Sequence, residues 1–374
     1  MPHSSSRPAP HGLTRLLKGA ATVALALAAT FALPAQGGSA ATSTAASSAP
    51  AARCCSVTIN GPAVTMTVSR PGATASKTFR AAVGDQLSEV LTNVVTSDNG
   101  CAFLTLLNPS GGTVDSSSGC SGTPAGVGPD TATVPGVYTV KMTLDAGATG
   151  HAKLWVSVPA GVGVAPENKP APAMNVTRVG QGVERTFTGS IGQRLDVAVT
   201  NVVTSDNGCA FLTLLNPSGG TVDASSACSG TPAGVGPDTL TVAGTYTVLL
   251  RFDTVATGTS KLWVSVPVSL GTITVNGTAK PVNVTRVGQG IERTFHGSTG
   301  ERITSMVGNV VTSDNGCVFL TILTKAGDTV DSSSACSGTP VTVGPDRLSA
   351  AGTYTALYQA DSIATGTGKL KITS

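Results

Sequence analysis

The 374-residue sequence has little charge, few aromatic rings and few histidines. Charged residues make up 11% of the chain, against about 25% in an ordinary soluble domain. Four histidines occur, and the two outside the first fifty residues, His151 and His296, do not recur in the internal repeat described below. The sequence also has no CxxC or HExxH motif. With no repeated Ser/His/Asp or Cys/His unit, the sequence predicts a protein that is not an enzyme.

Long apolar runs are also missing. The apolar stretch at 20–33 is too short to span a bilayer comfortably, and it lies between basic residues and a run of small residues. This pattern is typical of a secretory signal peptide, with plausible cleavage after Ala35 or Ala40; an uncleaved anchor is the alternative. We predict a signal peptide over 1–40, a flexible linker over 41–52 and no membrane span after cleavage.

The mature chain has no net positive charge. Removing residues 1–50 takes away three of the 23 basic residues and none of the 20 acidic residues, which leaves 20 of each. A chain of zero net charge gains little from neutralising phosphates, so nucleic acid is excluded as an expected partner. We expect a secreted bacterial protein, in the medium or docked on the cell surface, whose partner is an extracellular protein or polysaccharide.

An internal repeat occupies the chain after the predicted signal peptide and linker. The nonapeptide NVVTSDNGC occurs at 93–101, 201–209 and 309–317, a period of 108 residues. A fixed long period indicates tandem copies of one domain. The predicted domains are 53–159, 160–267 and 268–374.

Each repeat reads as short strands between Gly, Pro, Asn and Asp turns. Tyr246, Val248 and Leu250 alternate with Thr245 and Thr247, which is the period of a strand with one buried face. Eight or nine such strands in one repeat predict an all-β, two-sheet sandwich. In the first repeat the expected strands lie at 57–60, 64–68, 76–80, 87–95, 101–107, 112–117, 131–134, 137–145 and 153–158.

Two cysteines recur in each copy, 19 residues apart. A glycine turn at 109–112, centred between Ser110 and Gly111, places the two directly opposite each other on paired strands, within disulfide reach. We predict three cross-strand disulfides: Cys101–Cys120, Cys209–Cys228 and Cys317–Cys336. Cys54 and Cys55 lie outside the repeat, and either a vicinal bond or pairing with another chain fits them.

Several segments of the second repeat resemble the pre-peptidase C-terminal (PPC) domains of bacterial proteins. They are Leu240–Val248, Ala256–Thr259, Lys261–Val264, Gly192–Leu195 and Leu214–Gly220, and the resemblance extends over most of each repeat. It implies a jelly-roll-like β-sandwich that accompanies secreted enzymes or surface proteins and is not itself catalytic. Some members of the family bind calcium or polymeric substrates. The chain departs from the family in having no attached peptidase and in its cysteine-closed DNGC loop.

Recurring aspartates give a candidate calcium site. Asp98 and Asp115, with their equivalents, flank the closed hairpin, and carboxylates are preferred calcium ligands. Turn chemistry is the competing interpretation, because Asp in SDNG caps its own backbone. No dense DxDxDG loop is present, so the sequence predicts no cofactor beyond this candidate ion.

Trp155 and Trp263 are expected on the outward face of the last strand of their repeats. An exposed Trp can stack on sugar or on a partner. Since the third copy has Lys371 at this position and no following repeat, packing between repeats is the simpler interpretation.

The segment that contains the two cysteines of each repeat differs least between the copies. Residues 93–130 and 201–238 agree at 36 of 38 positions. A shared ligand contact and recent gene conversion both explain this sameness. The candidate contact residues are Thr96, Ser97, Asp98, Asn99 and Asp115, Thr204, Ser205, Asp206, Asn207 and Asp223, and Thr312, Ser313, Asp314, Asn315 and Asp331. The function expected is a binding or structural module; the alternatives are a carbohydrate- or envelope-binding accessory protein that uses exposed Trp, and a calcium-stabilised stalk.

Overall fold

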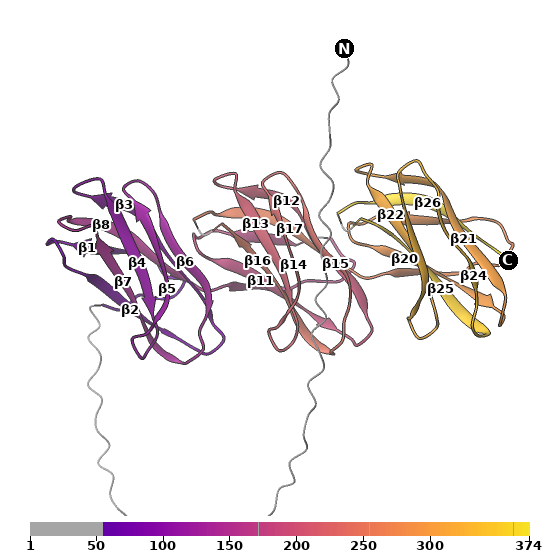
Figure 1. Ribbon diagram of the computed structural model, residues 1–374, viewed down its shortest axis with the longest axis horizontal. Helices are drawn as coiled ribbons and strands as arrows, with labels where there is room; N and C mark the ends of the chain where they lie inside the picture. Colours follow the sequence, from indigo (N-terminus) through magenta and orange to yellow (C-terminus); the bar gives the residue numbers. More distant parts are fainter. Residues whose placement is uncertain (1–54, 171, 254, 362) are drawn as a thin grey trace, which may run out of the picture. The chain divides into compact units, whose positions relative to one another are not determined.

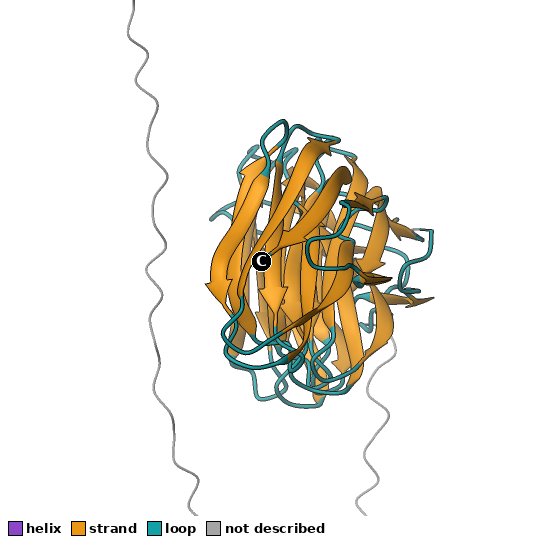
Figure 2. Ribbon diagram, turned by 90° about the vertical axis from the view of Figure 1, so that its right-hand side faces the viewer, coloured by secondary structure: helices purple, strands orange, loops and turns teal. Residues whose placement is uncertain are grey.

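The computed structural model describes residues 55–170, 172–253, 255–361 and 363–374. These residues form strands, turns and bends and no helix (Figure 2). None of them therefore forms a helix that could cross a membrane. The predicted signal peptide, the linker and Cys54 lie outside the described residues.

The described residues form twenty-six strands in three sets, one for each repeat (Figure 1). The first set is β1 (Val64–Val68), β2 (Ala75–Ala81), β3 (Gln86–Thr96), β4 (Cys101–Leu107), β5 (Thr113–Cys120), β6 (Ala125–Thr131), β7 (Gly136–Leu144) and β8 (Gly150–Ser157). The second is β9 (Ala160–Val164), β10 (Ala173–Val176), β11 (Gly182–Gly189), β12 (Arg194–Thr204), β13 (Cys209–Leu215), β14 (Thr221–Cys228), β15 (Ala233–Thr239), β16 (Gly244–Phe252) and β17 (Gly258–Ser265). The third is β18 (Val268–Thr272), β19 (Lys280–Val284), β20 (Gly290–Gly297), β21 (Arg302–Thr312), β22 (Cys317–Leu323), β23 (Thr329–Cys336), β24 (Val341–Arg347), β25 (Gly352–Ala360) and β26 (Gly366–Thr373).

The strand order in each repeat is that of a jelly roll. In the first repeat the two sheets run β1-β8-β3-β6 and β2-β7-β4-β5. The other repeats keep both orders and add one parallel strand, β9 beside β11 and β18 beside β20. Two Greek keys in eight antiparallel strands define this architecture. The predicted all-β fold of three jelly-roll-like sandwiches with eight or nine strands each is therefore confirmed.

Alternating side chains from the two sheets of a repeat fill its core, as in other sandwiches. In β16, Tyr246, Val248 and Leu250 are buried while Thr245 and Thr247 are not. The Tyr246 ring stacks on Phe187, with ring centroids 5.6 Å apart. The period-2 pattern therefore assigned the inward face of this strand correctly.

Two expected strands are wrong. Residues 57–60 form a turn instead, in which Asn60 has a φ of 55° and Gly61 N–H donates to the Thr58 carbonyl. The strand expected at 131–134 lies earlier, at β6 (Ala125–Thr131). Gly128 and Pro129 lie inside β6, and both residues argue against a strand when only the sequence is read.

Candidate functional site

The β4–β5 hairpin of each repeat has the predicted register at its cysteines. Cys101 is the direct partner of Cys120, and Leu106 is the partner of Asp115. The turn itself lies one residue earlier than expected, because Gly111 N–H bonds the Asn108 carbonyl. Gly111 then takes a left-handed φ of 86°, and the register shifts once more between Leu106 and Leu107. These two irregularities restore the register that the simple turn would have given.

The three predicted cross-strand disulfides are present, each joining cysteines 19 residues apart. The Cα atoms of each pair lie 3.7 Å apart, closer than expected. Cys101 and Cys120 form a non-hydrogen-bonded pair, which is the closer kind of opposed pair in an antiparallel ladder. Cys101 N–H donates to Asp145 and the Cys120 carbonyl accepts from Thr123, so neither group bonds across the pair. The pairing of Cys54 with Cys55 stays a prediction, since Cys54 lies outside the described residues.

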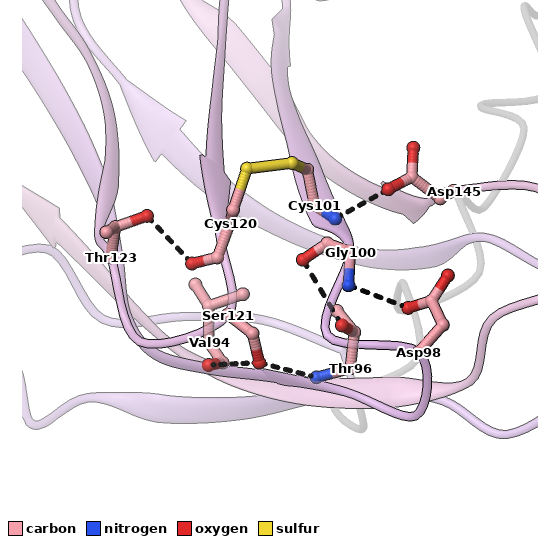
Figure 3. The surroundings of a disulfide bond; sticks show 9 residues. All are labelled: Val94, Thr96, Asp98, Gly100, Cys101, Cys120, Ser121, Thr123 and Asp145. Carbon is pink, nitrogen blue, oxygen red and sulfur yellow. Dashed lines mark hydrogen bonds between the residues drawn. A yellow bond between two sulfur atoms is a disulfide. The ribbon is translucent and has the colours of Figure 1, made fainter.

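The loop that connects β3 to β4 is held by its own polar groups (Figure 3). Thr96 Oγ1 donates to the Gly100 carbonyl at 3.2 Å, and Thr96 N–H donates to Ser121 Oγ. Ser97 Oγ accepts from Thr149 N–H, while Ser97 N–H donates to the Thr149 carbonyl. The same bonds recur in the other two repeats. This network gives the sameness of the hairpin a structural explanation beside the two that the sequence suggested.

A carboxylate from the end of β7 completes the loop. Asp145 Oδ2 accepts the Cys101 N–H at 2.6 Å, and Figure 3 shows this bond beside the disulfide. A Cβ added to Gly100 would lie 2.4 Å from this oxygen and 2.9 Å from Asp98 Oδ1. Glycine precedes the first cysteine because no side chain fits between the two carboxylates.

The structure divides the candidate contact residues. Ser97, Asp98 and Asn99 are exposed, and so are their equivalents. Thr96 is only 5% exposed and is a structural residue, which corrects the prediction that it contacts a ligand. The burial follows from its place at the end of β3, where its hydroxyl bonds the loop backbone. The same correction holds for Thr204 and Thr312.

The aspartates proposed for calcium serve the backbone. Asp98 Oδ1 accepts the Gly100 N–H at 2.9 Å, and this bond lowers the pKa of the exposed Asp98 carboxyl. Asp115 accepts from Ser116 N–H and from Gly128 N–H. Among the described residues, no group of three His, Cys, Asp or Glu side chains is placed to hold a metal ion. The turn interpretation therefore describes Asp98, whereas Asp115 links β5 to β6.

Each hairpin also carries an exposed aromatic ring that was not among the residues predicted from the sequence. Phe103, at the centre of β4, is 41% exposed, and its cross-strand partner on β5 is Ser118. Alternation along β4, in which Ala102 and Leu104 are buried, was the available signal. We call each such pair a ring site; the three ring sites are Phe103–Ser118, Phe211–Ser226 and Phe319–Ser334.

The phenylalanines of the second and third ring sites line open cavities that are also lined by residues of the preceding repeat. Phe211 borders a cavity of about 540 Å³ whose lining also includes Gln86 and Thr131 of the first repeat. Phe319 borders one of about 580 Å³ together with Gln359 and a row of serines. A small ligand pocket typically has a volume of about 300 to 1,000 Å³. Each of these rings therefore faces a space that another molecule can enter.

Trp155 is half-buried and partnered. Its Nε1–H donates to Thr92 Oγ1 at 3.0 Å, and the Arg178 guanidinium lies 4.9 Å from the ring centroid. Arg178 belongs to the segment after β10, in the second repeat, and also donates to the Gly61 carbonyl. Trp263 has the matching partners Thr200 and Arg286. This geometry favours packing between repeats over sugar stacking.

Further polar contacts join consecutive repeats, whose described residues belong to one compact unit. Arg251 donates to Ser88 Oγ and Gln86 Oε1, whereas Gln359 Nε2 donates to Asp196 Oδ2 at 3.2 Å. Burial, helped by the charge of Asp238, raises the pKa of Asp196 to about 7. Asp196 is therefore a buried carboxyl that is largely neutral in mildly acidic solution.

Glu89 is a second buried acid, at the inner face of β3. Burial, followed by the charges of Asp130 and Asp115, raises the pKa of Glu89 well above its ordinary value. Neither of its carboxyl oxygens has a hydrogen-bond partner. A neutral carboxylic acid is the form that such a site favours.

Comparison with known proteins finds only solved structures of low similarity to this chain. No protein-family model matches the chain, and a search of the curated proteins found no match. Among solved structures, the secreted serine protease VesC from Vibrio cholerae has 9% identity and a TM-score of 0.21, covering 75% of each chain. A β-glucuronidase from Ruminococcus gnavus has 9% identity and a TM-score of 0.17, covering 50% of this chain. This chain spans only 35% of the glucuronidase. Similarity this low supports no conclusion about activity.

Proposed function

We propose that the protein is a secreted, non-catalytic binding module of three disulfide-locked, PPC-like β-sandwich repeats that contacts an extracellular polymer or protein. One observation carries the proposal: an exposed phenylalanine beside a serine hydroxyl recurs at the same place in all three repeats. The rings of the ring sites are 41%, 46% and 43% exposed. Three disulfides in turn fit the oxidising environment outside the cell.

The chemistry of a ring site suits a partly apolar, hydroxyl-bearing partner. An aromatic face takes up apolar surface, and a neighbouring hydroxyl both donates and accepts hydrogen bonds. Sugars and polar protein surfaces offer both features. Phe103 and Ser118 are held by adjacent strands that a disulfide ties together, so little freedom is lost on binding.

Three copies of one site favour a repetitive partner. Linking modules turns later contacts into intramolecular events, which raises affinity by about 10² to 10⁴ for a linked pair when the geometry permits. A polymer presents the same unit many times. A single weak ring site is therefore sufficient for useful binding once three act together.

The test is co-sedimentation of the mature chain with insoluble polysaccharides and isolated cell walls. We expect the triple variant Phe103→Ala, Phe211→Ala and Phe319→Ala to lose most of the binding, and single variants to lose less. A matched control removes three exposed valines at equivalent positions of β3, β12 and β21: Val95→Ala, Val203→Ala and Val311→Ala. Full binding by the phenylalanine variant, or equal loss in both triple variants, would refute the proposal.

A further inference from the structure

A patch of basic side chains lies on the sheet β19-β26-β21-β24 of the third repeat. We define the terminal face as the exposed residues Arg302, Met306, Arg347, Lys369 and Lys371. Met306 is the cross-strand partner of Lys371, and Arg302 is the partner of Arg347. Lys369 and Lys371 are two positions apart on β26, so their side chains leave the same side of the sheet.

Only part of this patch recurs in the other repeats: Lys369 has the equivalents Lys153 and Lys261, and Arg302 has the equivalent Arg194 in the second repeat. The pair equivalent to Arg302 and Arg347 is Gln86 with Thr131 in the first repeat. Lys371 stands where Trp155 and Trp263 pack under an arginine of the next repeat.

The same surface is also more exposed in the third repeat than in the first two. Met306 is 40% exposed, whereas its equivalents Val90 and Ala198 are buried. The surface that joins one repeat to the next has become an open basic surface in the third.

The sheet that carries the terminal face contains few acidic residues. The four strands of this sheet contain one acidic residue, Asp346, whose cross-strand partner is the buried Ile303. Like charges directly opposite each other in a sheet are destabilising. Within the described residues, the four cations make no side-chain hydrogen bond or ion pair, so an external anion is what would relieve the repulsion between Arg302 and Arg347.

We propose that the terminal face binds an anionic extracellular polysaccharide, one that bears carboxylate or sulfate groups. Arginine pairs with such groups through two parallel hydrogen bonds, and lysine does so as a point charge. Lys369 and Lys371 lie about 6.6 Å apart along the strand, and Met306 beside them offers an apolar contact to a sugar ring. No aromatic residue occurs in these four strands, so the face has no platform for stacked bases.

This site is separate from the ring sites and goes beyond the function proposed above. It also assigns the C-terminal repeat a role of its own. Binding is expected to weaken with salt, because the polymer releases counterions when it meets the four cations.

The experiment measures binding of the mature chain to polygalacturonate and heparin, with neutral dextran as the uncharged probe and anionic lipid vesicles as a separate arm. In the face variant, Arg302, Arg347, Lys369 and Lys371 are all replaced by Gln. The control variant replaces Arg70, Arg80, Lys141 and Lys153 of the first repeat by Gln, which removes the same charge from exposed positions.

We expect the mature chain to bind at least one anionic polysaccharide and not dextran. The face variant should bind about tenfold more weakly or worse, with an unchanged melting temperature, while the control variant and the phenylalanine triple variant keep their affinity. Equal loss in the face and control variants, no binding to either anionic probe, or tighter binding to vesicles would each overturn the proposal. Loss in the phenylalanine variant alone would instead place the polymer on the ring sites.

Discussion

The carboxylate of Asp145 accepts a 2.6 Å hydrogen bond from the backbone N–H of Cys101, the first residue of β4. Asp253 holds Cys209 in the same way at 2.6 Å, and Asp361 holds Cys317 at 2.9 Å. The bond is charge-assisted and ties the end of β7 to the start of the hairpin. It explains why an aspartate recurs 44 residues after each first cysteine of the pair.

Replacing Asp145 by Ala should therefore destabilise the first repeat by about 1 to 3 kcal/mol, because the Cys101 N–H loses an ionised acceptor. Replacement by Asn keeps an oxygen at this place and should cost less. Chemical denaturation followed by circular dichroism measures both changes. Equal stability of the wild type and the Ala variant would contradict the role given to this carboxylate.

Removing one disulfide should weaken one repeat. The Cys101→Ser, Cys120→Ser double variant reopens a loop of about 20 residues, which costs on the order of 3 kcal/mol in the chain-entropy model. Unfolding with and without reductant gives the measurement. Reductant should lower the stability of the remaining two repeats and leave that of the variant repeat unchanged; a variant repeat still sensitive to reductant would disprove the assignment.

The free energy of unfolding should decrease as the pH rises, because the pKa of Asp196 is raised in the folded chain. The pKa of this carboxyl is raised from its ordinary 3.8 to about 7, so the folded chain holds a proton that the unfolded chain releases. The contribution is fully present below pH 4, is lost as the pH rises to about 7 and is constant above that. The pKa difference corresponds to on the order of 4 kcal/mol.

The variant Asp196→Asn should remove this dependence. Urea unfolding at pH 4, 5.5, 7 and 8 compares the two proteins, and the variant should gain relative stability toward pH 8. Glu89 titrates in both proteins, so the difference between them isolates Asp196. Parallel pH profiles would show that Asp196 ionises normally.

Arg178 should shield Trp155 from solvent. In a Trp263→Phe background Trp155 is the single tryptophan, and Arg178→Ala should shift its fluorescence to longer wavelength and increase its quenching by acrylamide. Loss of the cation–π contact should cost about 0.5 to 1 kcal/mol. Arg80→Ala, at an exposed site in the first repeat, serves as the control, and unchanged fluorescence in the Arg178 variant would count against the contact.

The sequence predicted well wherever a short-range rule fixes the backbone. The cysteine register followed from a glycine turn and a count of residues, and the inward face of β16 followed from alternation at Tyr246, Val248 and Leu250. Both depend on neighbours along one hairpin or one strand. The compensation at Gly111, which moved the turn without moving the cysteines, could not be foreseen because two irregularities cancel.

The features that the sequence did not predict depend on contacts between residues far apart in the sequence. Thr96 looks like a polar surface residue, and only its place under Ser121 and Gly100 buries it. Strand β6 contains Gly128 and Pro129, which read as a turn until β3 is seen beside them. The exposure of Phe103 and the opposed pair of Arg302 with Arg347 likewise emerge from pairing between strands.

Each disulfide joins an inner strand to a strand at the rim of its sheet: β5, β14 and β23 are all terminal in the strand order. A rim strand exposes backbone groups on which another chain can extend the sheet. Because it is covalently fastened to its neighbour, this strand cannot peel away and expose the apolar strand behind it. Oxidation of the three pairs should therefore matter for solubility at high concentration as well as for the free energy of unfolding.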